Sequence, residues 1–366
     1  EPYRRQRQMC IRDSQGGVTI TRVEIAREGL ERPRGRYVTL EVPRVSVLDE
    51  RDADVIETCA AELRALLPPE GPVLVLGIGN RRVTADALGP CTAQKILVTG
   101  CLAQRYQEEI LQEMPEVDGV LGTGSYFDVA NAVGQVLSGK RYKRFDDINA
   151  DQSEDGRILT TPEYYAYLKI AEGCDNHCAY CVIPKLRGKL RSRPMEELVK
   201  EAEQLAADGV KELIVVAQDT SRYGLDLYGE RKLAELLRRL CKIDGLVWVR
   251  VHYLYPDEMS QELIDVLANE PKIVKYLDIP IQHINDNILR AMNRRGNGEY
   301  VKQLLKKLRA RIPGLVIRTS LITGLPGEGE EEFQQLCEFL KEFKLERAGT
   351  FAFSPEEGTK AALMEY

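Results

Sequence analysis

The stretch EGCDNHCAYCVIP, residues 172–184, decides how this chain is interpreted. It holds three thiols, Cys174, Cys178 and Cys181, spaced C-x3-C-x2-C directly after an apolar run at 165–171. Thiolates are the soft ligands that select iron–sulfur clusters or zinc. Three cysteines can hold a 4Fe–4S cluster by three irons and leave the fourth iron open to a small molecule, whereas a structural zinc site takes four protein ligands. The spacing therefore predicts an iron–sulfur cluster.

Two other interpretations of this loop stay open. His177 lies between the first two cysteines and would complete a four-ligand zinc knuckle. The three cysteines would otherwise be unrelated buried thiols. A non-catalytic iron–sulfur or zinc-binding module is therefore an alternative to an enzyme.

The residues around the loop carry a resemblance. Tyr180 is an aromatic residue directly before the third cysteine, and the downstream segments read AQDTSRYGLDLYG at 217–229, YLDIPIQHINDNILRAMNRRG at 276–296 and TSLITGLPGE at 319–328. Together these segments resemble the radical S-adenosylmethionine (SAM) methylthiotransferases. Within that family they are most similar to the branch that modifies an aspartate of ribosomal protein S-twelve, and the tRNA-modifying branch is the rival. The resemblance begins at about Lys95.

The resemblance implies a reaction and its partners. The cluster on the three cysteines would bind SAM at its open iron, and one electron would split SAM into methionine and a 5'-deoxyadenosyl radical. The radical would take hydrogen from the β-carbon of an aspartate in ribosomal protein S-twelve. A methylated sulfur from a second 4Fe–4S cluster would be added there. A reductant such as flavodoxin or ferredoxin is implied as well, and nucleic acid is a partner only under the tRNA alternative, adenosine methylthiolation.

The pattern from Tyr164 onward alternates strands with helices and predicts a parallel sheet with right-handed crossovers. Six units fall short of the eight of a closed barrel, so the expected fold class is α/β, an open partial (βα)6 radical SAM barrel preceded by a composite α/β N-terminal region. The predicted strands are 165–171, 212–217, 246–252, 274–279, 315–323 and 347–353. The predicted helices are 195–208, 232–242, 260–268, 285–292, 300–311 and 330–343.

Active groups of a parallel barrel gather where its strands end. Arg250 or Arg318 would pair with the carboxylate of SAM or form an ion pair inside the barrel. His252 and Tyr253 also lie at a strand end, and His283 is interpreted as a cap of the next helix rather than an acid–base partner of Asp278. The candidate SAM contacts are Gln218, Asp219, Arg250, Asp278, Gln282, Arg318, Gly324 and Glu328.

The basic segment KLRGKLRSR alternates Lys185, Arg187, Lys189, Arg191 and Arg193 with other residues. In an extended chain these side chains would share one side. They would form either a solvated face or an electropositive rim for an acidic substrate or ribosomal RNA.

Residues 16–90 read as a small α/β piece of another kind. Strands are predicted at 18–25 and 36–43, a helix at 49–67 and a buried strand at 73–79 before a glycine-rich turn. These segments resemble the spore germination protease family, which implies Asp86 as a catalytic aspartate and an aspartic-type peptidase as the alternative of another class. Such a mechanism needs a second carboxylate, so we interpret Asp86 as a loop or cap residue.

The segment KILVTGCLAQRY at 95–106 resembles the last third of the methylthiotransferase N-terminal domain, with strands at 96–100 and 117–121 and helices at 102–114 and 127–137. In that family this domain supplies three cysteines to the second cluster. Here only Cys101 stands in its own context. Cys59 and Cys91 are candidate substitutes, but their surroundings do not match. We therefore interpret the chain as a chimera that keeps SAM cleavage and lacks efficient sulfur transfer.

The predicted organisation has five parts. A non-native or disordered leader at 1–14 precedes a germination-protease-like fragment at 15–93, a truncated methylthiotransferase N-terminal domain at 94–140, a linker at 141–163 and the radical SAM domain at 164–366, with the family's C-terminal substrate-binding β-barrel missing.

Composition places the chain among cytoplasmic globular proteins. Its 366 residues are 43% hydrophobic and 30% charged, without an apolar run long enough to span a membrane. Nine cysteines, three of them clustered, favour metal binding in a reducing compartment over disulfides. The net charge of −6 argues against a surface that coats nucleic acid.

Overall fold

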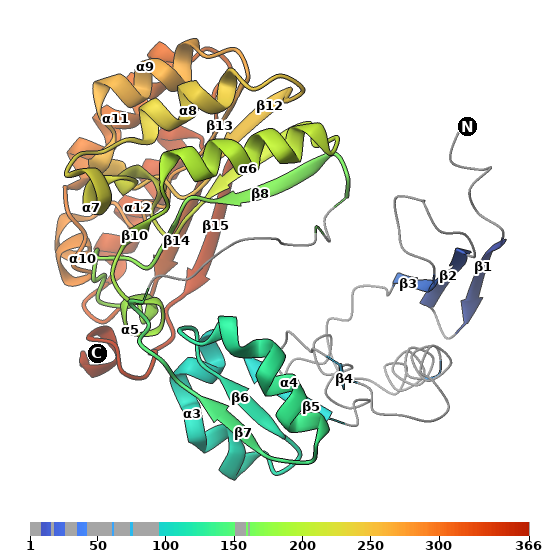
Figure 1. Ribbon diagram of the computed structural model, residues 1–366. Helices are drawn as coiled ribbons and strands as arrows, with labels where there is room; N and C mark the ends of the chain where they lie inside the picture. The colour runs from blue at the N-terminus through green and yellow to red at the C-terminus, as the bar shows by residue number, and fades with distance from the viewer. Residues whose placement is uncertain are drawn as a thin grey trace. The chain divides into compact units, whose positions relative to one another are not determined.

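The computed structural model describes residues 9–15, 18–25, 35–41, 61, 74–75, 95–150, 159 and 162–365 (Figure 1). The chain divides into two compact units, Glu1–Asp147 and Ile148–Tyr366, and each is considered by itself. The predicted helix at 49–67, apart from residue 61, and the predicted turn with Asp86, together with Cys59 and Cys91, lie outside the described residues.

The second unit is built on one six-stranded sheet whose order is β15-β14-β13-β12-β11-β8. Every neighbouring pair in it is parallel. Strands β8 and β15 are the two edges, so the sheet is open, and the predicted partial barrel is confirmed. The strands are β8 (Tyr165–Lys169), β11 (Glu212–Val216), β12 (Trp248–Val251), β13 (Ile273–Asp278), β14 (Val316–Thr323) and β15 (Arg347–Ala352).

Helices follow the strands in alternation and cover the outer side of this sheet, as Figure 1 shows for α6, α8, α9 and α11. Three of them begin at side-chain caps: Ser260, Asn285 and Asn297 each accept a hydrogen bond from a backbone N–H of the first turn. The longer helices are α6 (Met195–Ala207), α8 (Leu233–Cys241), α9 (Gln261–Asn269), α10 (Asp286–Ala291), α11 (Gly298–Arg311) and α12 (Glu330–Phe343). The shorter ones are α5 (Ile183–Arg187), η4 (Thr220–Arg222), α7 (Leu225–Tyr228), η5 (Pro256–Glu258) and η6 (Ala361–Leu363).

Strand alternation separates an apolar outer face from a polar inner face. Val249 and Val251 of β12 are buried in the core shared with the helices, and Arg250 between them is not. Because successive side chains of a strand point to opposite faces, Arg250 and His252 share the inner face. The register that pairs Asp278 with Arg318 places those two charged residues side by side. The sheet thus presents charged groups on the face that the helices do not cover.

The first unit contains a parallel sheet of order β4-β5-β6-β7. Its described helices pack on this sheet through Ala103 and Ile110 on one and Ala132 and Val136 on the other. Strand β7 falls within the segment interpreted as a linker, because its pairing with β6 is a tertiary contact that local composition does not reveal. The elements are β4 (Leu74–Val75), β5 (Lys95–Thr99), α3 (Cys101–Glu113), β6 (Gly119–Leu121), η3 (Tyr126–Asp128), α4 (Val129–Leu137) and β7 (Tyr142–Arg144).

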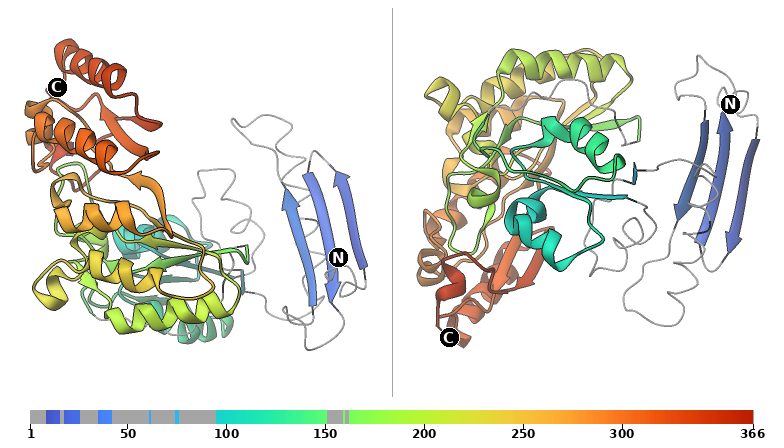
Figure 2. Two further views of the ribbon diagram at one scale, coloured as in Figure 1. Left: turned by 90° about the horizontal axis from the view of Figure 1, so that it is seen from above. Right: turned by 60° about the horizontal axis from the view of Figure 1, so that its bottom comes forward.

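A separate antiparallel sheet, coloured blue in Figure 2, comprises β1 (Met9–Gln15), β2 (Val18–Ile25) and β3 (Gly35–Glu41). The two predicted strands at 18–25 and 36–43 are confirmed. Strand β1 overlaps residues 9–14 of the segment interpreted as a non-native or disordered leader. Only a Gly-Gly pair separates β1 from β2 in the sequence, and such pairs favour two-residue hairpin connections.

Candidate active site

The three-cysteine loop lies directly after the first barrel strand. A short antiparallel ribbon of β9 (Ala171–Glu172) and β10 (Arg191–Ser192) closes it at its base. Gly173 adopts φ +79°, and a Cβ there would lie 2.0 Å from the carbonyl oxygen of Lys189, so only glycine fits before Cys174. The N–H of Cys174 donates to the carbonyl of Gly188 at 3.1 Å. The loop is therefore held in place by backbone contacts independent of any bound group.

The thiols themselves are half-buried and close enough to influence one another. Burial is the main cause that raises the pKa of the Cys174 thiol to about 11; the Asp219 carboxylate and the thiols of Cys178 and Cys181 add to the rise, and a hydrogen bond from the N–H of Asn176 opposes it. Burial also raises the pKa of Cys181. The thiols of Cys174 and Cys181 therefore stay protonated at neutral pH until a metal displaces their protons.

The donor set fits a cluster better than a single ion. Across the described ranges, no three His, Cys, Asp or Glu side chains approach closely enough to share one metal ion. A zinc knuckle requires its ligands in one coordination sphere, whereas a 4Fe–4S cluster offers a different iron to each thiolate. Three cysteines on one anchored loop are the donor set that a 4Fe–4S cluster would take, one thiolate to each of three irons.

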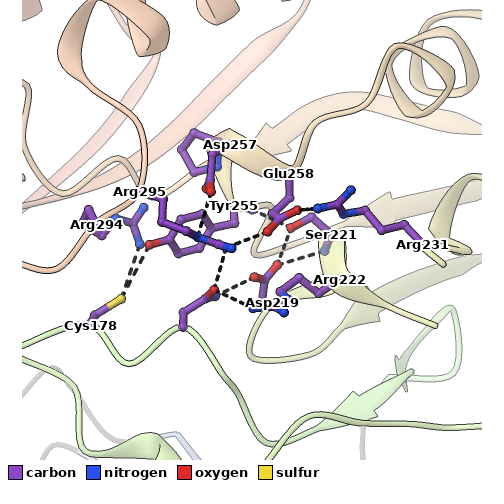
Figure 3. Close-up of polar contacts among 12 residues, drawn as sticks. Cys178, Asp219, Ser221, Arg222, Arg231, Tyr255, Asp257, Glu258, Arg294 and Arg295 are labelled. Atoms are coloured by element: carbon purple, nitrogen blue, oxygen red, sulfur yellow. Dashed lines mark hydrogen bonds and ion pairs between the residues drawn. The ribbon is translucent and has the colours of Figure 1, made fainter. Parts of the chain in front are cut away.

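Figure 3 shows a polar network that joins this loop to the ends of other strands. The amide of Asn176 donates to the buried carboxylate of Asp219 at 2.7 Å. Arg295 donates to the Asn176 side-chain oxygen at 2.9 Å and pairs with Asp257 at 2.9 Å and Glu258 at 2.6 Å. Asp219, a predicted SAM contact, is thus occupied in fixing the cysteine loop.

Two side chains in the same network approach the sulfur of Cys178. The Tyr255 hydroxyl lies 3.8 Å from it, and the Arg294 guanidinium lies 3.9 Å from it. The Arg294 guanidinium also lies over the Tyr255 ring, 3.8 Å from its centroid. Neither residue was singled out from the sequence, although the basic pair in MNRRG was visible there.

Glu172, at the start of the loop, gathers polar partners around its carboxylate. Gln218 donates to it at 2.9 Å, Lys169 pairs with it at 3.0 Å, and Arg187 at 3.4 Å. Burial raises the pKa of Glu172, but the two cations outweigh it and hold this pKa below its ordinary value. The side-chain oxygen of Gln218 is buried and has no hydrogen-bond partner among the described residues. It is therefore available to accept a hydrogen bond from a donor group of a ligand.

The inner face of the barrel carries a polar triad of Arg318, Asp278 and His252. Arg318 donates to the fully buried carboxylate of Asp278 at 2.7 Å, and His252 Nδ1 lies 3.7 Å from the other oxygen of that carboxylate. Burial lowers the pKa of His252, against the nearby Asp278, so the imidazole is neutral at pH 7. His252 Nε2 is buried without a partner among the described residues. Arg318 is therefore paired with Asp278, and Nε2 of His252 is left without a partner among the described residues on the inner face of the barrel.

Arg250 is turned to the opposite end of the strands. It donates to Glu212, the first residue of β11, at 2.5 Å, and its guanidinium lies over the ring of Tyr276. Of the two roles that the sequence left open for Arg250, the structure places it in the ion pair inside the barrel.

The remaining predicted contacts lie after β13 and β14. The Nδ1 atom of His283 accepts the N–H of Asn285, while Nε2 lies 3.4 Å from Glu328. The cap of α10 is Asn285, which corrects the interpretation of His283 as the cap. Glu328 also accepts the N–H of Gly324 at 2.5 Å, and a Cβ at Gly324 would meet open space. Gln282 bridges to β14 through its backbone with φ +68°.

Four non-glycine residues with positive φ lie in the loops of this unit near the strand ends. They are His177 in the cysteine loop, Tyr253 after β12, Gln282 after β13 and Asn293 after α10. Such conformations cost free energy and persist where the surroundings determine them. Their grouping marks the same end of the barrel as the unpartnered polar atoms.

The profile of the radical SAM superfamily matches residues 168–340. The ribosomal protein uS12 methylthiotransferase RimO of Lachnoclostridium phytofermentans is 55% identical over 340 residues, which is 92% of this chain and 74% of that protein. This chain belongs to the uS12 methylthiotransferase family. RimO of Pelotomaculum thermopropionicum is 53% identical over 318 residues, 86% of this chain and 70% of that relative.

Other relatives in the family are longer than the matched part. RimO of Desulforamulus reducens is 51% identical over 278 residues, and the chain spans 62% of its length. The solved structure of the radical SAM methyltransferase TsrM from Kitasatospora setae, with tryptophan substrate and a SAM analog bound, aligns with a TM-score of 0.57 at 15% identity. It covers 81% of this chain and 65% of that chain. At that identity the likeness concerns the fold alone.

A second profile matches the first unit. The germination protease profile covers residues 4–125, consistent with the composite N-terminal region inferred from the sequence. Asp86 lies outside the described residues. Cys101 begins α3 after Gly100, whose φ is +104°.

The basic segment does not form one uniform face. Residues Ile183–Arg187 are helical rather than extended. Arg187 pairs with Glu172, and Arg193 pairs with Glu201 at 2.8 Å. The expectation of five cations on one side is therefore wrong, because the first three residues of the segment, Lys185–Arg187, belong to α5. None of the helices in the described part of the chain combines the length and apolarity needed to cross a bilayer.

Proposed function

We propose that this chain cleaves SAM reductively at an iron–sulfur cluster held by Cys174, Cys178 and Cys181. In the full reaction of its family this cleavage serves methylthiolation of an aspartate in ribosomal protein uS12. The observation that carries the proposal is the anchored three-cysteine loop at the end of the first strand of an open parallel barrel, in a chain of the uS12 methylthiotransferase family.

The unpartnered polar atoms support a ligand between the strand ends and the cysteine loop. Gln218 Oε1, His252 Nε2 and Asp278 Oδ2 are buried and have no hydrogen-bond partner among the described residues. Buried polar atoms without partners are rare in folded proteins and are explained by a missing ligand or water. Gly324 offers open space where a side chain would stand, so its backbone can approach a ligand closely.

The chain's own residues would position the ligands as follows. The thiolates would hold three irons, and the bound cluster would supply the electron that cleaves SAM. Asp278 holds Arg318 in a fixed orientation, which leaves the other guanidinium donors of Arg318 for an anionic group. Neutral His252 offers Nε2 as a hydrogen-bonding atom. Of the other predicted contacts, Asp219 and Arg250 are occupied by protein partners, whereas Glu328 accepts the N–H of Gly324 through one oxygen and keeps Oε1 without a hydrogen-bond partner among the described residues.

We further infer that this chain transfers a methylated sulfur to uS12 only weakly. Cys101 is the one second-cluster cysteine that stands in its family context, so we infer one stable cluster, about four irons per chain rather than about eight. The division of the chain into five parts, as predicted from the sequence, is also part of this proposal. Its partners would be uS12 and a one-electron donor such as flavodoxin or ferredoxin, in the reducing cytoplasm where free thiols persist.

The test uses the full chain, purified and reconstituted with iron and sulfide without oxygen. We expect about four irons per chain and release of 5'-deoxyadenosine from SAM with dithionite, both abolished in Cys178→Ala. A methylthio mass shift should appear weakly or not at all on uS12 and not on tRNA. Zinc in place of iron would overturn the proposal, and so would equal iron in Cys178→Ala. Efficient methylthiolation of uS12 would contradict the loss of the second half.

A further inference from the structure

The three cysteines receive unequal hydrogen bonds. Cys174 and Cys181 accept hydrogen bonds from the backbone N–H groups of Asn176 and Ile183. Cys178 is instead approached by two side chains, Tyr255 at 3.8 Å and Arg294 at 3.9 Å from its sulfur (Figure 3). A guanidinium is charged at every accessible pH, and hydrogen bonds that involve a charged group are about twice as strong as neutral ones. Cys178 is therefore the sulfur that the Arg294 guanidinium hydrogen-bonds, and the charge of the same guanidinium also acts on Cys181.

The guanidinium of Arg294 is fixed by contacts from two other strand ends. It donates to the carbonyl of Pro280, after β13, at 2.5 Å. It lies over the ring of Tyr255, after β12, at 3.8 Å from the centroid. Both contacts come from segments that follow barrel strands. The fold of the barrel therefore fixes the position of the guanidinium, although an arginine side chain is flexible by itself.

Arg294 also lacks an anionic partner within the described part of the chain. Its hydrogen-bond acceptors there are the Pro280 carbonyl and the Cys178 sulfur, and no carboxylate forms an ion pair with it. Its neighbour Arg295 differs, since it pairs with Asp257 and Glu258. The positive charge of Arg294 is therefore available to negative charge that develops at Cys178.

We propose that Arg294, supported by Tyr255, is a positioning residue that raises the reduction potential of the cluster bound at Cys178. The inference rests on the proposed function, because it requires Cys178 to be a cluster ligand. Reduction transfers one electron from an external donor of the flavodoxin or ferredoxin class to the cluster, which becomes more negative by one charge without breaking a bond. Hydrogen bonds to the sulfurs and nearby positive charge stabilise that more negative state.

The experiment measures the midpoint potential of the reconstituted full chain by poising it at a series of potentials and recording the electron paramagnetic resonance signal of the reduced state. In Arg294→Gln we expect reduction to become about tenfold less favourable, a shift of ~59 mV to lower potential for one electron. Tyr255→Phe should shift the potential in the same direction by less. Arg294→Lys should restore part of the shift, because it keeps the charge and loses the planar fork.

Arg295→Gln is the matched control. It removes the same charge one residue later, from a side chain that contacts Asn176, Asp257 and Glu258 instead of a sulfur. We expect a much smaller shift than in Arg294→Gln. Equal potentials in the wild type, Arg294→Gln and Arg295→Gln, each with full iron content, would overturn the proposal.

Iron content separates the possible failures. If Arg294→Gln loses its iron, the proposal is tested by the midpoint potentials of Arg294→Lys and Tyr255→Phe. Unchanged potentials in both of these variants would overturn the proposal. If Cys178→Ala keeps the iron of the wild type, the proposed function fails instead, since Cys178 is then no ligand.

Discussion

The chain holds two cysteine-bearing turns after parallel strands, and they are built differently. Cys101 follows β5 and begins α3, whose N-cap Gly100 offers no side chain and whose interior is broken at Gln107 with φ +42°. The loop of Cys174, Cys178 and Cys181 follows β8 and is tied to several other segments. Its partners come from the segments after β11, β12 and α10.

The difference shows what distinguishes a site from a turn that carries a thiol. Asn176 reaches Asp219 after β11, Cys178 meets Tyr255 after β12, and Asn293 after α10 donates to the carbonyl of His177 at 2.8 Å. A ligand is held rigidly only when the groups around it are themselves fixed by neighbours. The barrel supplies such neighbours because parallel strands deliver all their following loops to one end.

The largest expected effect compares the thiols directly. Cys181→Ala should remove nearly all of the reconstituted iron, about four atoms per chain, whereas Cys101→Ala should leave it unchanged. Iron and sulfide analysis after desalting measures both. Equal losses in the two variants would mean that the two turns share one metal site, contrary to the distinction drawn here.

The next effect compares ion pairs of the two units. Arg318→Gln leaves the fully buried Asp278 carboxylate without its cation and should destabilise the barrel by about 2–3 kcal/mol. Arg144→Gln, in the first unit, removes a cation that is 37% exposed and pairs with Asp128 and Asp146, so it should destabilise its unit less than Arg318→Gln destabilises the barrel. Urea unfolding followed by circular dichroism reports on both units, and tryptophan fluorescence reports on the barrel, which holds the single Trp248. Equal losses of stability in the two variants would show that burial does not determine how much each ion pair contributes.

A smaller effect depends on pH. Burial lowers the pKa of His252 and of His283 below 6.5, so the folded barrel resists protons that the unfolded chain accepts. This contribution is fully present above about pH 6.5 and is lost as pH falls through the folded pKa values, at no more than about 1.4 kcal/mol per pH unit for each histidine. His283→Asn should lose less stability than the wild type between about pH 7 and pH 5. If the stability of His283→Asn and of the wild type changed equally with pH, the buried His283 would not be a source of the pH dependence.

The smallest effect concerns helix starts. Ser260 caps α9 by accepting the N–H of Leu263 at 3.1 Å, and Ser260→Ala should cost about 1 kcal/mol. Ser260→Asp, which keeps an acceptor, is the matched control. The described helices α3 and α4 of the first unit begin without side-chain caps, so no comparable loss is available there. A cost in Ser260→Asp equal to that in Ser260→Ala would assign the effect to something other than capping.

Much of the barrel could be predicted because its elements are long and regular. The predicted helix at 330–343 coincides with α12, and the predicted strand at 315–323 differs from β14 by one residue. Their periodicity is a local property of the sequence. Strand β7 was missed, because three residues show no periodicity, and it exists through its pairing with β6.

The candidate site was predicted only in part, for a related reason. The strand-end positions of Gln218, Asp278 and Gly324 followed from the order of elements. The roles of Asp219 and Arg250 did not, since each is taken up by a partner distant in sequence, Asn176 and Glu212 respectively. Arg294 was overlooked although it contacts Cys178, because 116 residues separate them.

The amino-acid sequence by itself determined the three-thiol spacing, the alternation of apolar strands and amphipathic helices, and the family. Only the tertiary structure decided which cysteine meets a cation, which arginine pairs with Asp278, and which buried oxygens and nitrogens are left without a partner. The physical reason is that spacing and periodicity are local, whereas these contacts depend on strand order and register, which bring residues from distant segments to one end of the sheet.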